Sequence, residues 1–242
     1  MTTRRAYVAA ALLLPLLLTG CKNTSPTAVP PPPTPSSTPS PTPPKLLDIK
    51  PPNTPEQLQA ALPTAYGKVK FSLSSALVSD WTPRDDPFEG HRVEPESCRA
   101  ELWTGGRTPK TFAKFPYLPY ADAFPTSKTN GLHAGLVSVP APFGDKYLDA
   151  YPLAAPQCVK ILIDGRDQAS IVERPVPGLG TRSRFYLRTY TKDGKVHREG
   201  QISFITPTYY ATVANYATSY DEATLIAFAH HVQALADSKL KR

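Results

Sequence analysis

The side chains best suited to hold a ligand lie on two segments joined by Asp193-Gly194. An Asp-Gly pair between alternating segments is the strongest short-range signal of a two-residue β-hairpin turn. Tyrosine and arginine on one face of such a hairpin can stack on sugars or hold anionic groups. The candidate ligand-binding residues are therefore Arg184, Tyr186, Arg188, Tyr190, His197 and Gln201.

The turn also fixes the register of the hairpin, because it places Lys192 opposite Lys195. In this register Arg188 faces Glu199 on one face, and Phe185 meets Ile202 on the other. We expect the Phe185 face to be buried in the core and the Arg188 face to be exposed to solvent. The alternative for the Arg188 face is a solvated sheet surface without a ligand.

Sequence motifs for catalysis are scarce. The chain contains no Gly-x-Ser-x-Gly, His-Glu-x-x-His or phosphate-loop motif. His230 and His231 are adjacent on an expected helix, where neighbouring residues do not face one another. The sequence therefore predicts no catalytic residue, no metal site and no cofactor.

The N-terminus has the features of an export signal over residues 1–20. Arg4 and Arg5 precede the apolar run Ala6–Leu18, which is too short to span a bilayer as a helix. Leu18-Thr19-Gly20-Cys21 resembles the bacterial lipobox. This resemblance implies that the Cys21 thiol receives a diacylglyceryl group and becomes the first residue of an anchored protein. The alternative is an ordinary signal peptide with a cysteine at its end.

Residues 21–53 form the lipidated cysteine and a tether. Pro26–Pro55 contains 13 prolines in 30 residues. Proline removes a backbone donor and favours polyproline II, which rises about 3.1 Å per residue. Residues 22–53 could then reach on the order of 100 Å. We interpret the segment as a spacer, with a Pro-x-x-Pro recognition segment as the alternative.

Residues 54–242 are expected to form one extracytoplasmic globular domain. Their 22 basic and 19 acidic side chains give a net charge of only +3, which argues against a nucleic-acid partner. Apart from Cys21, the chain contains two cysteines, Cys98 and Cys158. Both lie in a domain that is expected to be exported, where a disulfide between them can persist. Both precede strand-like runs. The alternative is two buried free thiols.

The elements of this domain indicate an α+β fold. Thr54 caps a short helix over 55–62, and Ser219 with Glu222 forms a capping box for a helix ending near Ser238. We predict no helix or strand over residues 109–130. Strands other than the hairpin are expected at Val69–Leu73, Leu132–Val139, Val159–Ile163 and Tyr209–Tyr216. We predict an antiparallel β-sheet with the C-terminal amphipathic helix packed on it and one disulfide.

The order of these features resembles actinobacterial cell-surface lipoproteins. The lipobox, the Pro/Thr tether, Cys98 and the segment Tyr151–Cys158 followed by paired strands and a last helix carry the resemblance. Over residues 90–240 the domain distantly resembles the extracellular sensor domain of mycobacterial transmembrane serine/threonine kinases. That family implies an α+β, disulfide-bonded domain with a ligand-binding cleft. Its domains have two disulfides, whereas this chain has cysteines for one.

These observations predict a lipoprotein held on the outer face of the cell membrane by its diacylglyceryl group. Its domain would be non-enzymatic and would bind or sense an envelope glycan or a small molecule. Two alternatives remain, a cell-envelope enzyme acting on peptidoglycan or glycan, and a structural partner of another envelope protein.

Overall fold

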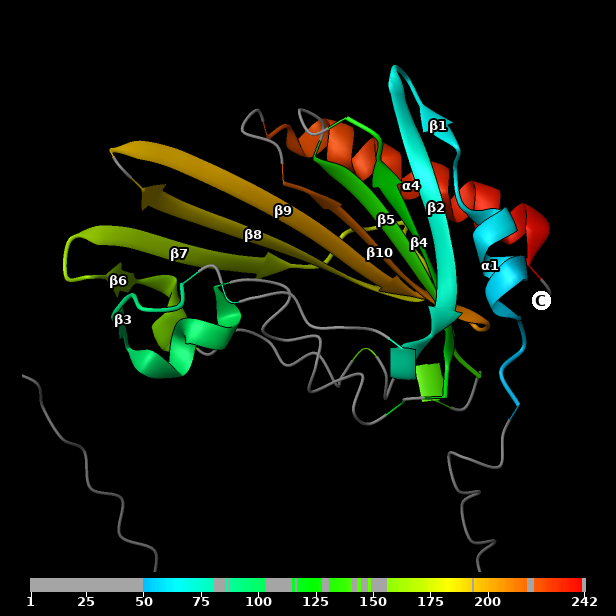
Figure 1. Cartoon of the computed structure of the whole chain (residues 1–242), viewed down its shortest axis with the longest axis horizontal. Helices are drawn as coiled ribbons and strands as arrows, with labels where there is room; N and C mark the ends of the chain where they lie inside the picture. Colours follow the sequence, from blue (N-terminus) through cyan, green and yellow to red (C-terminus); the bar gives the residue numbers. More distant parts are fainter. Residues whose placement is uncertain are drawn as a thin grey trace, which may run out of the picture. The chain divides into compact units, whose positions relative to one another are not determined.

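The computed structural model describes residues 50–80, 86, 88–102, 115, 117–127, 131–140, 143, 144, 148, 156–192, 194–216 and 220–240. Their strands join into one ten-stranded sheet in which all neighbours are antiparallel, in the order β1-β2-β4-β5-β10-β9-β8-β7-β6-β3 (Figure 1). The strands are β1 (Ala65–Tyr66), β2 (Val69–Leu77), β3 (Val93–Glu94), β4 (Pro119–Pro125), β5 (Leu132–Ser138), β6 (Ile161–Ile163), β7 (Asp167–Arg174), β8 (Arg182–Lys192), β9 (Lys195–Ile205) and β10 (Tyr209–Asn215). The predicted fold class is confirmed.

Two α-helices pack on one face of the sheet, the helix face. They are α1 (Pro55–Ala61) and α4 (Glu222–Lys239). The predicted cap of α1 is present: the Thr54 side chain accepts a hydrogen bond from the Gln57 amide, and the Gln57 side chain accepts one from the Thr54 amide, which completes a capping box. The main core lies between these helices and the sheet and includes Leu58 of α1, Phe185 of β8 and Phe228 of α4.

Helix α4 begins two residues later than the sequence predicts. Its N-cap is Asp221, whose carboxylate accepts from the amides of Ala223 and Thr224. The predicted N-cap Ser219 lies outside the described residues. The Asp221 carboxylate can accept hydrogen bonds from both of these amides, and its negative charge is favourable at the positive end of the helix. The apolar face of α4 is buried as expected, through Leu225, Phe228, Ala229, Val232 and Ala236.

The opposite face of the sheet, the second face, carries two further apolar clusters. One lies near Val137, Tyr210 and Ile205, and the other gathers around the disulfide. The cysteines lie in the 3-10 helices Glu96–Glu101 (η3) and Pro156–Val159 (η5). The strand expected after Cys98 is wrong, because the chain continues there as η3, whereas the strand expected after Cys158 is present as β6 and begins at Ile161. We call residues 88–102 and 156–163 the disulfide module.

The entry of the chain into the domain is fixed at Asn53. Its backbone amide donates to Ser138 Oγ at 2.9 Å, and its side-chain amide donates to the carbonyl of Thr208 at 3.5 Å. Asn53 is buried, with 2% of its surface exposed. Asn53 therefore ties this part of the chain to the end of β5 and to the segment just before β10.

Candidate functional site

The hairpin of β8 and β9 has the predicted register. Lys192 lies opposite Lys195, Arg188 opposite Glu199, and Phe185 opposite Ile202. Gly194 has a φ of 73°, as a two-residue turn requires, and Asp193 lies outside the described residues. The alternation brings the six predicted ligand-binding side chains to the second face: Arg184, Tyr186, Arg188, Tyr190, His197 and Gln201.

This face is not exposed as predicted. Arg188 and Tyr186 each retain only 5% of their surface, because the disulfide module covers the hairpin. The covering residues come from parts of the chain at least 19 positions away from β8. Alternation along the hairpin shows which residues share a face, but it does not show that a distant segment packs on it.

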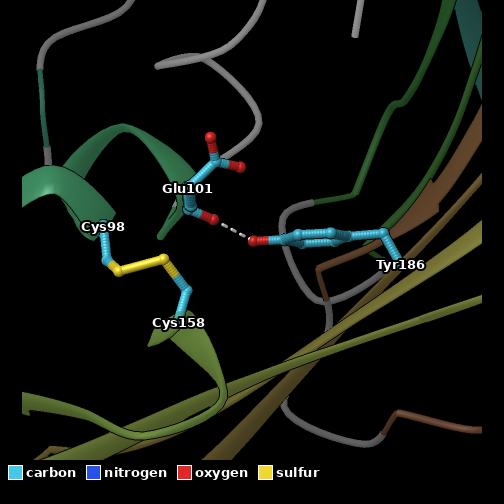
Figure 2. Close-up of a disulfide and its surroundings, with 4 residues drawn as sticks. All are labelled: Cys98, Glu101, Cys158 and Tyr186. Atoms are coloured by element: carbon cyan, nitrogen blue, oxygen red, sulfur yellow. Dashed lines mark hydrogen bonds between the residues drawn. A yellow bond between two sulfur atoms is a disulfide. The ribbon is translucent and has the colours of Figure 1, made fainter. Parts of the chain in front are cut away.

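The disulfide joins the two halves of the module and holds them against the sheet. Cys98 and Cys158 are bonded at 2.01 Å across 60 residues, which confirms the predicted pair. Next to it, the Tyr186 hydroxyl donates to the backbone carbonyl of Glu101 (Figure 2). Tyr186 therefore connects β8 directly to η3.

Arg188 is the centre of a charged and aromatic group. One guanidinium nitrogen, Nη2, donates to Glu199, and the guanidinium carbon lies 4.8 Å from the Tyr190 ring centroid and 5.6 Å from that of Phe88. The other two guanidinium nitrogens, Nε and Nη1, are buried without a hydrogen-bond partner. Such atoms are rare in folded proteins and require an explanation.

Of the other predicted ligand-binding side chains, His197 and Tyr190 contact the group around Arg188, and Gln201 bonds to Ser203 instead. His197 stacks on Tyr190 with ring centroids 5.0 Å apart, and the Tyr190 hydroxyl donates to Glu199. Burial, and then the charge of Glu199, raises the pKa of Tyr190. Gln201 donates to Ser203 Oγ at 3.1 Å while its Oε1 is buried without a partner.

Sequence reasoning missed a second polar pair on the same face. Asp122 of β4 and His133 of β5 approach to 3.1 Å, with side chains 18% and 14% exposed. An added Cβ at Gly135 would lie 2.7 Å from the Asp122 carboxylate, so the glycine gives the pair its space. The pair was missed because β4 was not predicted, although Pro119–Pro125 alternates buried and partly exposed residues as a strand does.

Other polar groups gave no sign of a metal centre. The described residues contain no group of three or more histidine, cysteine, aspartate or glutamate side chains placed to hold an ion. His231 of the adjacent histidine pair instead packs on Tyr66, with ring centroids 5.3 Å apart. Cys21 lies outside the described residues, and no helix within them is long and apolar enough to cross a membrane.

Replacing Arg188 with alanine should lower the free energy of unfolding by about 3 kcal/mol, because Glu199 would lose its buried partner. Chemical denaturation of the variant measures this loss. Arg198→Ala, an exposed position on the same hairpin, serves as the control and should change stability by about 0.5 kcal/mol or less. Equal effects at both positions would mean that Arg188 contributes little to the packing of the module.

The fold has counterparts among solved structures. The extracellular domain of PknH from Mycobacterium tuberculosis aligns with a TM-score of 0.52 and 10% identity, over 78% of this chain and 96% of that domain. An uncharacterized protein from Mycobacterium smegmatis aligns with a TM-score of 0.42 and 18% identity, over 72% of this chain and 90% of that one. No protein-family profile and no curated protein sequence matches the chain. The distant resemblance to a mycobacterial extracellular sensor domain is thus confirmed at the level of the fold.

Proposed function

We propose that this protein is a lipoprotein that is lipid-anchored on the extracytoplasmic face of the cell membrane, and that its domain binds or senses a ligand without chemically changing it. The ligand occupies the second face of the sheet. One observation carries this proposal: Arg188 and Gln201 hold hydrogen-bonding atoms that are buried and have no partner in the protein. A buried polar group without a partner costs stability, and a ligand that supplies the partner removes this cost.

A binding role suits the contacts of this face better than catalysis. His197, the only histidine among the six predicted residues, stacks on Tyr190. The nearby serine, Ser203, is bonded to Gln201 and Tyr210. These contacts hold the side chains in fixed positions, but they do not pair a nucleophile with a base in the way that covalent catalysis needs.

An extracytoplasmic location is supported by two independent features. The disulfide between Cys98 and Cys158 is of a kind that persists in oxidising compartments. The fold is similar to that of an extracellular domain. The lipobox-like segment before Cys21 supplies the attachment to the membrane.

Native mass spectrometry of the full-length protein, extracted from its own membranes, tests the binding function. We expect a small molecule that stays bound under native conditions and is released on denaturation. The covalent lipid is the internal control, because it remains on the protein in both spectra. Identical masses under native and denaturing conditions, at every extraction condition in which the protein is folded, would contradict the proposal.

The attachment is tested by Cys21→Ser. Without the thiol no thioether to a diacylglyceryl group can form, so the variant should leave the membrane fraction almost completely. Cys21 precedes the expected globular domain, so the substitution should not disturb that domain, and circular dichroism should show the same thermal transition as for the wild type. Full retention of the variant in the membrane fraction would exclude Cys21 as the anchor.

A further inference from the structure

Two cross-strand rows of mainly polar residues run across the second face, between its two apolar clusters. We call these two rows the polar band. The first row contains His133, Ala214, Gln201 and Tyr186, and the second contains Asp122, Gly135, Thr212, Ser203 and Arg184. The next row on one side is Val137, Tyr210 and Ile205 of an apolar cluster. On the other side lies Arg188 beside Ile171, beneath the disulfide module.

The middle of the polar band is built from short side chains. Ala214 of β10 lies between His133 of β5 and Gln201 of β9, and Gly135 lies beside Asp122. Neighbouring strands are about 4.8 Å apart, so the backbones of His133 and Gln201 are about 10 Å apart. Ala214 is short, so the longer side chains of His133 and Gln201 extend further from the sheet on either side of it. A molecule lying on this face would therefore contact His133 and Gln201.

Both long side chains present a hydrogen-bond acceptor without a donor. Gln201 Oε1 and His133 Nδ1 are buried and have no partner. Because Asp122 contacts His133 Nε2, the favoured neutral tautomer carries its hydrogen on Nε2 and leaves a lone pair on Nδ1. Solvent does not reach either atom, so water at the surface does not satisfy them. The missing partner must therefore offer at least two donors.

The charges of the band favour a neutral partner. Asp122 is negative and Arg184 is positive, and at the border Arg188 is already paired with Glu199. An added anion would find no unbalanced positive charge here, whereas hydroxyl groups can donate to Gln201 and His133 and accept from the free Arg188 nitrogens.

We propose that the polar band binds a neutral polyhydroxylated ligand, a saccharide, with Gln201 and His133 accepting hydrogen bonds from its hydroxyl groups. This inference rests on the proposed binding function and specifies its ligand class. Since both acceptor atoms are closed to solvent, they must become accessible before the ligand can reach them. Association should therefore be much slower than diffusion.

The test is a titration of the full-length protein in detergent with four neutral saccharides: N-acetylglucosamine, its β-1,4 tetramer, mannobiose and trehalose. Inorganic phosphate serves as the anionic probe. At least one saccharide should bind in isothermal titration calorimetry and raise the melting temperature. Gln201→Met should weaken that binding at least tenfold while leaving the ligand-free melting temperature equal or higher, because it removes an unpartnered acceptor. The control is Gln168→Met at an exposed position of β7, which should bind as the wild type does.

The outcomes separate the ligand class from the binding function. Binding of phosphate without any saccharide, lost in Arg188→Leu, would overturn the ligand class and leave the binding function in place. Saccharide binding that is unchanged in Gln201→Met would overturn this site. A protein that releases a small molecule in native mass spectrometry but binds none of the saccharides would also overturn the inference, whereas the absence of any released molecule would contradict the binding function itself.

Discussion

Phe185→Ala is expected to lower the free energy of unfolding by about 3–5 kcal/mol, the usual cost of removing a buried aromatic ring. Phe185 retains 1% of its surface and lies in the main core between the sheet and the two helices. The Arg174 guanidinium lies over its ring at 4.4 Å, so the substitution also removes a cation–π contact. Urea denaturation followed by circular dichroism measures the loss.

Val172→Ala is the matched control for this substitution. Val172 lies on the same face of the sheet but is 50% exposed, so its truncation should cost well under about 1 kcal/mol. Similar losses for Phe185 and Val172 would mean that the assignment of buried and exposed positions on the helix face is wrong.

Removal of the disulfide is expected to cost about 4 kcal/mol, the value that the loop-entropy argument assigns to a cross-link of about 60 residues. The double variant Cys98→Ala, Cys158→Ala is suitable, because both side chains are fully buried and alanine introduces no new polar group. Chemical denaturation gives the loss, and hydrogen exchange should show it concentrated in the disulfide module. The main core around Phe228 lies on the opposite face and should keep its protection.

Peptide mass spectrometry provides the control for the disulfide experiment. In the unreduced wild-type protein, Cys98 and Cys158 should resist alkylation and appear as one linked peptide pair. If both thiols are alkylated without reductant while the protein retains full stability, the bond does not contribute to the fold.

The hairpin shows what local sequence can determine. The turn at Asp193-Gly194 and strict alternation were sufficient to predict each pair from Lys192–Lys195 to Phe185–Ile202. Register is well specified there because a shift by one residue would move Phe185 out of the core. The same reasoning identified the apolar face of α4, since its spacing follows the helical period.

Contacts between distant segments were not predictable in this way. Strand β4 was missed because prolines suggested a loop, yet Pro119 and Pro125 stand at its two ends, where a missing donor is tolerated. The cover on Arg188 comes from the disulfide module, whose 3-10 helices have no strong periodicity. The polar band was missed because its two rows combine residues from five strands, and only the order of those strands in the sheet brings them together.

The fixed position of Asn53 has a mechanical consequence. Tension on the residues that precede it would be carried first by the hydrogen bonds of Asn53 to Ser138 and Thr208, and so would load the edge where β5 ends. The hairpin tip at Gly194 lies at the other end of β9, about 33 Å away at the normal rise per residue, and bears none of this load. Under such tension the domain would therefore begin to yield where Asn53 is held, while the second face of the sheet kept its shape.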